Sequence, residues 1–276
     1  MKFRFDRFRT IALMLPVVLS VGCSNPKSGS GTGSTGTGST ATYPDSTGNW
    51  VVVATATSGA LPFSQLSGYI NEQQTGTSHP TTAAFQPVST GCYAATENVP
   101  MQGVVQGLRL HVVSFGLDQQ VLDLSAAKDT TSTHFTGSYA VTGGCADGAA
   151  GTVTGTRYDA LTGTYSGTVS GSSPSQTVAV AITQYASGTG DANFLLSGTV
   201  TVTGVSCFTK GSLSPQNGSV VGANVQMHFV ASQGATMDIV GTFDTAASVI
   251  TVSSLYVGGT GCPATVNLGP VTLSKA

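Results

Sequence analysis

The sequence contains an internal repeat in which rare residues recur at a spacing of 115 positions. The pattern Cys, aromatic, x6, Pro, x2, Gly, x3, Gly occurs at residues 92–107 and again, with the same internal spacing, at residues 207–222. Agreement of this kind without gaps predicts a duplicated unit. We therefore expect two consecutive units of ordinary domain size, at residues 48–160 and 161–276.

Aromatic residues also match between the two copies. Trp50 and Tyr165 stand 115 positions apart near the start of each unit. An aromatic side chain there is expected to plug a core, and a platform that stacks against a sugar is the alternative. Near the end of each unit the spacing becomes 117, and on that spacing Tyr139 matches Tyr256.

Hydrophobic residues alternate with polar or small ones in both units, for example at 108–113, 178–182 and 225–229. A period of two predicts strands with one buried face, and 36 Gly disfavour helices. About eight strands with short turns are expected in a unit. We predict an all-β protein of two tandem antiparallel meander units, each a small up-and-down β-barrel, because closure leaves no strand edge exposed. A β-sandwich, or one β-structure shared by both units, is the alternative.

The first 22 residues have the composition of a signal peptide. They begin with four basic residues, Lys2, Arg4, Arg7 and Arg9. An apolar run of eleven residues, 11–21, follows, and as a helix it is too short to cross a hydrocarbon core of ~30 Å. A cleaved signal peptide is therefore favoured over a membrane-spanning helix.

The end of this run, Gly22-Cys23, resembles the lipobox of bacterial lipoproteins, in which the Cys is lipidated. The resemblance implies cleavage after residue 22 and a lipid anchor on Cys23. Because Ser24 rather than Asp follows, it also implies the outer membrane of the cell envelope. The body loosely resembles uncharacterised Gly/Thr/Val-rich envelope lipoproteins. An ordinary signal peptide with an incidental Cys23 is the alternative.

A low-complexity stretch separates this leader from the repeated units. Residues 28–42 contain only Ser, Gly, Thr and one Ala, a composition typical of a flexible linker. We therefore interpret residues 23–47 as a lipidated Cys followed by a tether, which holds the folded units away from a membrane surface.

Four further cysteines lie in the repeated units: Cys92, Cys145, Cys207 and Cys262. An even number of Cys in an exported protein predicts disulfides. The duplication favours one bridge in each unit, Cys92–Cys145 and Cys207–Cys262, each stabilising its unit by about 4 kcal/mol in the chain-entropy model. The strand count places the two Cys of a unit in loops at the same end. A metal site is the weaker alternative, because no CxxC pair is present.

Charge is scarce, at 8% of residues, and this scarcity argues against nucleic-acid binding. Loss of residues 1–22 removes four basic residues and one acidic residue, which leaves six basic and eleven acidic ones. A chain this poor in basic residues has no patch that could neutralise the phosphates of a nucleic acid.

The four histidines do not form a catalytic pattern. His79 precedes Pro80 and is expected in a polar loop, whereas His111 and His228 are expected on the polar side of their strands as solvated imidazoles. The sequence also lacks HExxH, GxSxG and Walker A motifs. We expect no catalytic residue, no metal and no cofactor.

Two acidic positions recur in both units. Asp123 and Asp238 are expected within strands, and Asp129 and Asp244 near strand ends, in Asx-turns. Recurrence in both units favours a shared structural role over a pair of catalytic carboxylates.

These observations favour a non-catalytic lipoprotein facing the cell surface or the periplasm, with a small apolar ligand or a glycan as its partner. A small barrel can hold one ligand inside. A structural or adhesive protein of the cell envelope is the main alternative, and an enzyme is a third. No residue of the sequence identifies a ligand-binding site.

Overall fold

The structure is a computed structural model that describes residues 43–89, 92–93, 98–117, 119–172, 174–186 and 191–276. The predicted signal peptide, the predicted lipidation site at Cys23 and all of the predicted tether before residue 43 lie outside the described residues. Within the described part of the chain, no helix has the length and the apolar character needed to cross a membrane.

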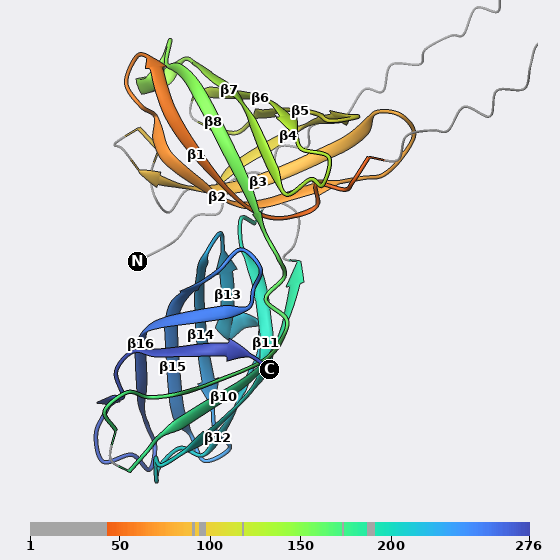
Figure 1. The fold of residues 1–276 in the computed structure, drawn as a ribbon. Helices are drawn as coiled ribbons and strands as arrows, with labels where there is room; N and C mark the ends of the chain where they lie inside the picture. The colour runs from red at the N-terminus through yellow and green to blue at the C-terminus, as the bar shows by residue number, and fades with distance from the viewer. Residues whose placement is uncertain (1–42, 90–91, 94–97, 118, 173, 187–190) are drawn as a thin grey trace, which may run out of the picture. The chain divides into compact units, whose positions relative to one another are not determined.

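The first unit is a closed antiparallel barrel of eight strands in sequence order (Figure 1). Its strands are β1 (Gly48–Ser58), β2 (Phe63–Glu72), β3 (His79–Ser89), β4 (Val99–Gln106), β5 (Arg109–Ser114), β6 (Val121–Lys128), β7 (His134–Thr142) and β8 (Ala150–Tyr158). Each strand pairs with the next, and β8 pairs with β1 to close the wall. The predicted up-and-down barrel is confirmed.

The second unit is also a closed antiparallel barrel. Its strands are β9 (Gly163–Thr168), β10 (Thr177–Ala186), β11 (Phe194–Thr203), β12 (Lys210–Leu213), β13 (Gly218–Val221), β14 (Asn224–Val230), β15 (Ala235–Phe243), β16 (Val249–Gly259), β17 (Val266–Asn267) and β18 (Val271–Lys275). Both β12 and β13 pair with β11 and β14, so the two short strands share one position in the wall. Strand β17 pairs only with β16 and stands beside the main path of the sheet.

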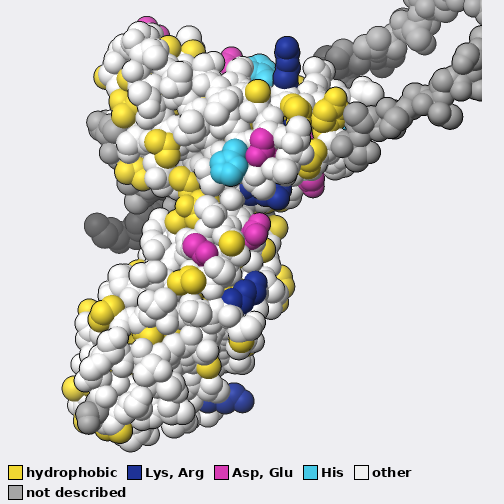
Figure 2. Space-filling view, in the orientation of Figure 1, with side chains coloured by type: hydrophobic (Ala, Val, Ile, Leu, Met, Phe, Trp, Pro, Cys, Tyr) yellow, Lys and Arg dark blue, Asp and Glu magenta, His cyan; other side chains and the backbone are white. Residues whose placement is uncertain are grey.

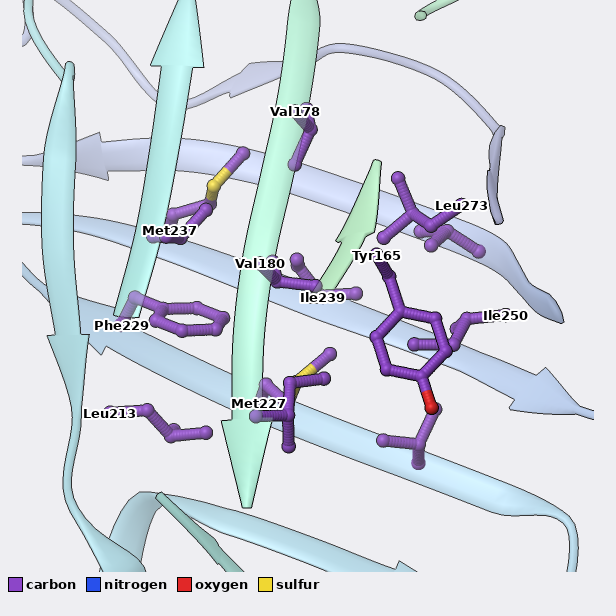
Figure 3. Packing of buried hydrophobic residues seen from close by; sticks show 14 of the residues in the cluster. Tyr165, Val178, Val180, Leu213, Met227, Phe229, Met237, Ile239, Ile250 and Leu273 are labelled. Carbon is purple, nitrogen blue, oxygen red and sulfur yellow. The ribbon is translucent and has the colours of Figure 1, made fainter. Parts of the chain in front are cut away.

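The alternation in the sequence sorts side chains between the inside and the outside of each wall. On β5, Leu110 and Val112 are buried, whereas Arg109 and His111, which alternate with them, are exposed. In the second barrel, side chains from β9, β10, β14, β15, β16 and β18 point toward one another and form one continuous apolar cluster (Figure 3). A comparable cluster occupies the first barrel and includes Trp50, Phe63, Phe85 and Phe135. The interior of each barrel is therefore occupied by the protein's own side chains, whose burial stabilises the fold.

Each barrel has one disulfide, which joins two connections between its strands. Cys92 pairs with Cys145 and Cys207 pairs with Cys262, with Cα atoms 5.8 and 5.1 Å apart, as the duplication predicts. The first Cys of each pair lies between the third and fourth wall positions, and the second Cys lies between the seventh and eighth.

The aromatic residue after the first Cys of each unit lies in the core. Tyr93 is 1% exposed and Phe208 is fully buried, and each belongs to the core of its barrel. The repeated Cys-aromatic motif thus places a core ring directly beside each disulfide.

The other matched aromatic pair also lies in the cores. Trp50 packs against Phe135 with ring centroids 5.0 Å apart, and its Nε1 donates a hydrogen bond to the Ser46 carbonyl. Tyr165 is fully buried and its hydroxyl donates to the Ala247 carbonyl. The prediction that these residues plug the core is confirmed, and neither ring is available to stack on a sugar.

The match of Tyr139 with Tyr256 is wrong. Tyr139 is 2% exposed inside the first barrel, whereas Tyr256 is 39% exposed on the outside of the second. The register between β15 and β16 shifts at a β-bulge, where Ser253 is one residue more than the pairing needs. Tyr256 consequently lies opposite Asp238, the place that Ala140 takes opposite Asp123 in the first barrel.

Candidate functional site

Two groups of polar side chains stand out in the described part of the chain. One is buried at an end of the first barrel, and the other lies on the outer wall of the second. We describe the buried group first, because it corrects an expectation from the sequence.

His79 does not lie in a solvated loop. It is the first residue of β3, its side chain is 14% exposed, and its Nδ1 lies 2.6 Å from Oε1 of Glu72 at the end of β2. The prediction of a polar loop is wrong, because a buried carboxylate on the neighbouring strand draws the imidazole into the wall.

Glu72 also forms a fully buried ion pair. Nζ of Lys128, at the end of β6, lies 3.2 Å from Oε2 of Glu72, and both side chains have no exposed surface. We call Glu72, His79 and Lys128 the end cluster. Burial raises the pKa of Glu72, but hydrogen bonds from His79 and Ser46 and the charge of Lys128 outweigh it and hold that pKa below its usual range.

The end cluster holds residues 43–47, which we call the lead segment. The backbone N–H of Ser46 donates to Oε2 of Glu72 at 2.8 Å. Nζ of Lys128 donates to Oγ of Ser46 at 2.7 Å and to the Pro44 carbonyl at 3.1 Å. Because these contacts satisfy the buried charges from within the protein, the end cluster fastens the chain to the barrel and offers no open catalytic site.

The second barrel performs the same fastening with neutral groups. The N–H of Leu161 donates to Oε1 of Gln184 at 2.8 Å, as Ser46 donates to Glu72, and the N–H of Gln184 donates to Oγ1 of Thr162. At the repeat spacing of 115, the residue that corresponds to Lys128 is Phe243, which is buried and uncharged. Charge at this place is therefore particular to the first barrel.

On the outer wall of the second barrel, three side chains line up across neighbouring strands. His228 on β14 lies directly opposite Asp238 on β15, which lies directly opposite Tyr256 on β16. Nδ1 of His228 is 2.5 Å from Oδ1 of Asp238, and these two side chains are 43% and 47% exposed. We call His228, Asp238 and Tyr256 the outer row.

A hollow of about 470 Å³ lies beside the outer row, with His228 and Asp238 in its lining. Four amide side chains also line it: Asn193, Gln216, Asn217 and Gln226. None of these amides is hydrogen-bonded to another side chain within the described residues, and each can both donate and accept. We call this feature the amide hollow. Its chemistry suits a ligand with many hydroxyl groups, since hydroxyls also donate and accept.

The first barrel has a similar pair on its outer wall. Nε2 of His111 on β5 lies 3.0 Å from Oδ1 of Asp123 on β6, and the side chains are 51% and 48% exposed. A hollow of about 480 Å³ adjoins this pair, with Arg109, His111 and Ser125 in its lining. The predicted exposure of His111 and His228 is confirmed, but each imidazole is paired with an acid.

The other recurring acids have the turn role that the sequence predicts. Oδ1 of Asp129 accepts a hydrogen bond from the N–H of Thr133, and Oδ1 of Asp244 accepts from the N–H of Ser248 and of Val249. Several such bonds to Asp129 hold its pKa far below the usual range, although burial opposes them. These carboxylates shape the β6–β7 and β15–β16 turns.

Charged side chains are few on the face of the molecule drawn in Figure 2. Within the described residues, His, Cys, Asp and Glu do not gather into any group of three or more that could hold a metal ion. All four Cys of the units are used in disulfides.

Comparison of the chain with protein-family models, with curated proteins and with solved structures finds no match.

Sequence reasoning missed the end cluster and the amide hollow. Glu72 corresponds in its contacts to Gln184, but 112 positions separate the two residues, so the repeat spacing of 115 did not connect them. The four amides come from the segment before β11, the turn before β13 and strand β14, and they share no motif. The recurrence of Asp123 and Asp238 was the one available signal, and it is consistent with the His–Asp pairs.

Proposed function

We propose that this protein is an exported, non-catalytic binding protein whose ligand is a neutral glycan, bound at the amide hollow and the outer row. The observation that carries the proposal is the junction of an exposed aromatic ring, a His–Asp pair and four available amides on one wall. Sugars present hydroxyl groups to polar side chains and C–H faces to aromatic rings, so both kinds of group are needed together.

The choice of a neutral glycan rests on what else the molecule offers. The interiors of the barrels are occupied by side chains, which argues against a small apolar ligand held inside. The residues that line the amide hollow include one carboxylate, Asp238, and no Lys or Arg, which disfavours an anionic polymer.

The experiment is a binding titration with soluble neutral oligosaccharides and a pull-down on insoluble polysaccharides. We expect Tyr256→Ala and Asp238→Asn each to weaken binding by about tenfold or more, because each removes a contact worth ~1–2 kcal/mol. Tyr185→Ala is the matched control, since Tyr185 is also an exposed tyrosine on the second barrel but, unlike Tyr256, does not lie opposite Asp238.

Two results would contradict this proposal. One is equal binding by wild type and by Tyr256→Ala, and the other is loss of binding in Tyr185→Ala alone. Recovery of the oligosaccharide uncleaved after long incubation is the result expected of a non-catalytic protein.

We also propose that the protein is attached to the outer membrane by a lipid on Cys23. The Gly22-Cys23 sequence and the two disulfides, which form in oxidising compartments, support this location. Cells fed an alkyne-tagged fatty acid should label wild type, and Cys23→Ser should lose the label. Labelling that persists in Cys23→Ser would reject the anchor.

A structural or adhesive role in the envelope is the second candidate, and a specific feature favours it. Hydroxyl side chains run across the outer wall of the first barrel, where Ser125, Ser138 and Thr152 lie opposite one another on β6, β7 and β8. Such a row can form many weak contacts with a surface. Attachment that is lost on deletion of the gene but unaffected by Tyr256→Ala would favour this role over glycan binding at the amide hollow.

A further inference from the structure

The two barrels carry exposed His–Asp pairs at equivalent places in their walls. Asp123 and Asp238 are 115 positions apart, and each is bonded to a histidine on the preceding strand, β5 or β14. Each pair adjoins a surface hollow of similar size, about 480 and 470 Å³.

The histidines come from different positions in the two copies. His228 lies directly opposite Asp238, whereas His111 lies opposite Ser125 and reaches Asp123 diagonally. By the repeat spacing, His111 corresponds to Gln226 and His228 to Val113. Copying of one unit would place the histidines at equivalent positions, so the two pairs were not simply inherited together.

Stability does not explain why both barrels have such a pair. All four side chains are about half exposed, and exposed ion pairs contribute little to folding. Recurrence of the pair from different positions therefore points to a shared task at the surface.

The two pairs have the same kinds of unused hydrogen-bonding groups, with Nδ1 of His111 in one and Nε2 of His228 in the other. In each, one carboxylate oxygen and one ring nitrogen take no part in the bond between the two side chains. A carboxylate oxygen accepts from a hydroxyl, and a ring nitrogen donates or accepts according to its tautomer. Two neighbouring hydroxyls on a sugar ring match this arrangement.

We propose that the first barrel has a second glycan-binding site centred on His111 and Asp123, so that one chain binds two units of the same neutral polymer. The inference rests on the proposed function of the second barrel. The side chain opposite Asp123 is Ala140, where the second barrel has Tyr256 opposite Asp238. The site on the first barrel therefore lacks an aromatic contact and is the weaker of the two.

The test is calorimetric titration of the whole protein with a short neutral oligosaccharide, using variants that remove each site in turn. Wild type should bind two equivalents, one tighter than the other. Asp238→Asn with Tyr256→Ala should leave one weak equivalent. Adding Asp123→Asn should reduce that residual binding by at least about tenfold.

A gain of binding provides the second readout. Ala140 is exposed on β7, so a larger side chain there meets solvent. In the variant that lacks the second-barrel site, Ala140→Tyr should strengthen the residual binding by about tenfold, because it supplies the missing ring. Ala56→Tyr, at an exposed position on β1 outside the hollow beside His111, is the control and should not strengthen it.

The possible failures are distinguishable. Wild type that binds no neutral glycan overturns both the proposed function and this inference. Binding of one equivalent, abolished by Asp238→Asn with Tyr256→Ala, keeps the proposed function and overturns the second site. Residual binding that is changed neither by Asp123→Asn nor by Ala140→Tyr also overturns the second site.

Discussion

At the scale of single residues, the buried ion pair of Glu72 and Lys128 is the most consequential contact in the first barrel. Both side chains are fully buried, and together they hold Ser46 and Pro44. Loss of one partner would leave a charge without compensation in a medium of low dielectric, which is strongly destabilising.

We predict that Lys128→Met lowers the free energy of unfolding by about 3 kcal/mol, since the Glu72 carboxylate then remains buried without its cation. The double variant Glu72→Gln with Lys128→Met should recover most of that loss, because the second barrel uses the neutral Gln184 and Phe243 at the corresponding places. Denaturant unfolding of the wild type and both variants measures the difference. A double variant as unstable as Lys128→Met would contradict this explanation.

At the scale of elements, the lead segment is attached to β2 and β6 through groups that titrate. The pKa of Glu72 is lowered in the folded protein, so its ionised form stabilises the fold. This contribution is fully present above the ordinary glutamate pKa of 4.5 and is lost as the pH falls through the lower pKa of the folded state.

Acid should therefore loosen this end of the first barrel. The indole of Trp50, the single tryptophan, donates to the Ser46 carbonyl, so its fluorescence reports on the lead segment. We predict a change in emission below pH 4.5 in wild type, and a smaller one in the double variant that lacks the ion pair. Identical acid profiles for the two proteins would show that Glu72 does not control the attachment.

Strand positions were predictable from the sequence because burial on one face imposes a period of two. The alternation at 108–113 places Leu110 and Val112 inside the barrel and His111 outside, as expected. The bulge at Ser253 was not predictable, because an inserted residue and a shifted register leave similar patterns in one sequence. For that reason Tyr256 was matched to the buried Tyr139 instead of the exposed Ala140.

At the scale of the whole molecule, the duplication predicted the architecture well and the candidate site poorly. Two closed barrels and the pairing of all four Cys follow from residues that recur in register. The amide hollow is made of Asn193, Gln216, Asn217 and Gln226, which come together only when β11, β14 and the turn before β13 are side by side. Surface polar residues are under little packing constraint. The sequence therefore has no periodic pattern that indicates which of them lie close together in the fold.

The end cluster also determines how the folded protein responds to tension. A pull that arrives along the chain from before residue 43 meets Pro44 and Ser46 first, and these residues are bonded to Lys128 on β6 and Glu72 on β2. The load is therefore shared between β2 and β6 before it can separate β1 from the wall. The second barrel, whose first strand follows another folded unit, has only neutral bonds at the same place. The buried ion pair of Glu72 and Lys128 thus lies at the point where a pull on the N-terminal side of the chain would first reach the folded protein.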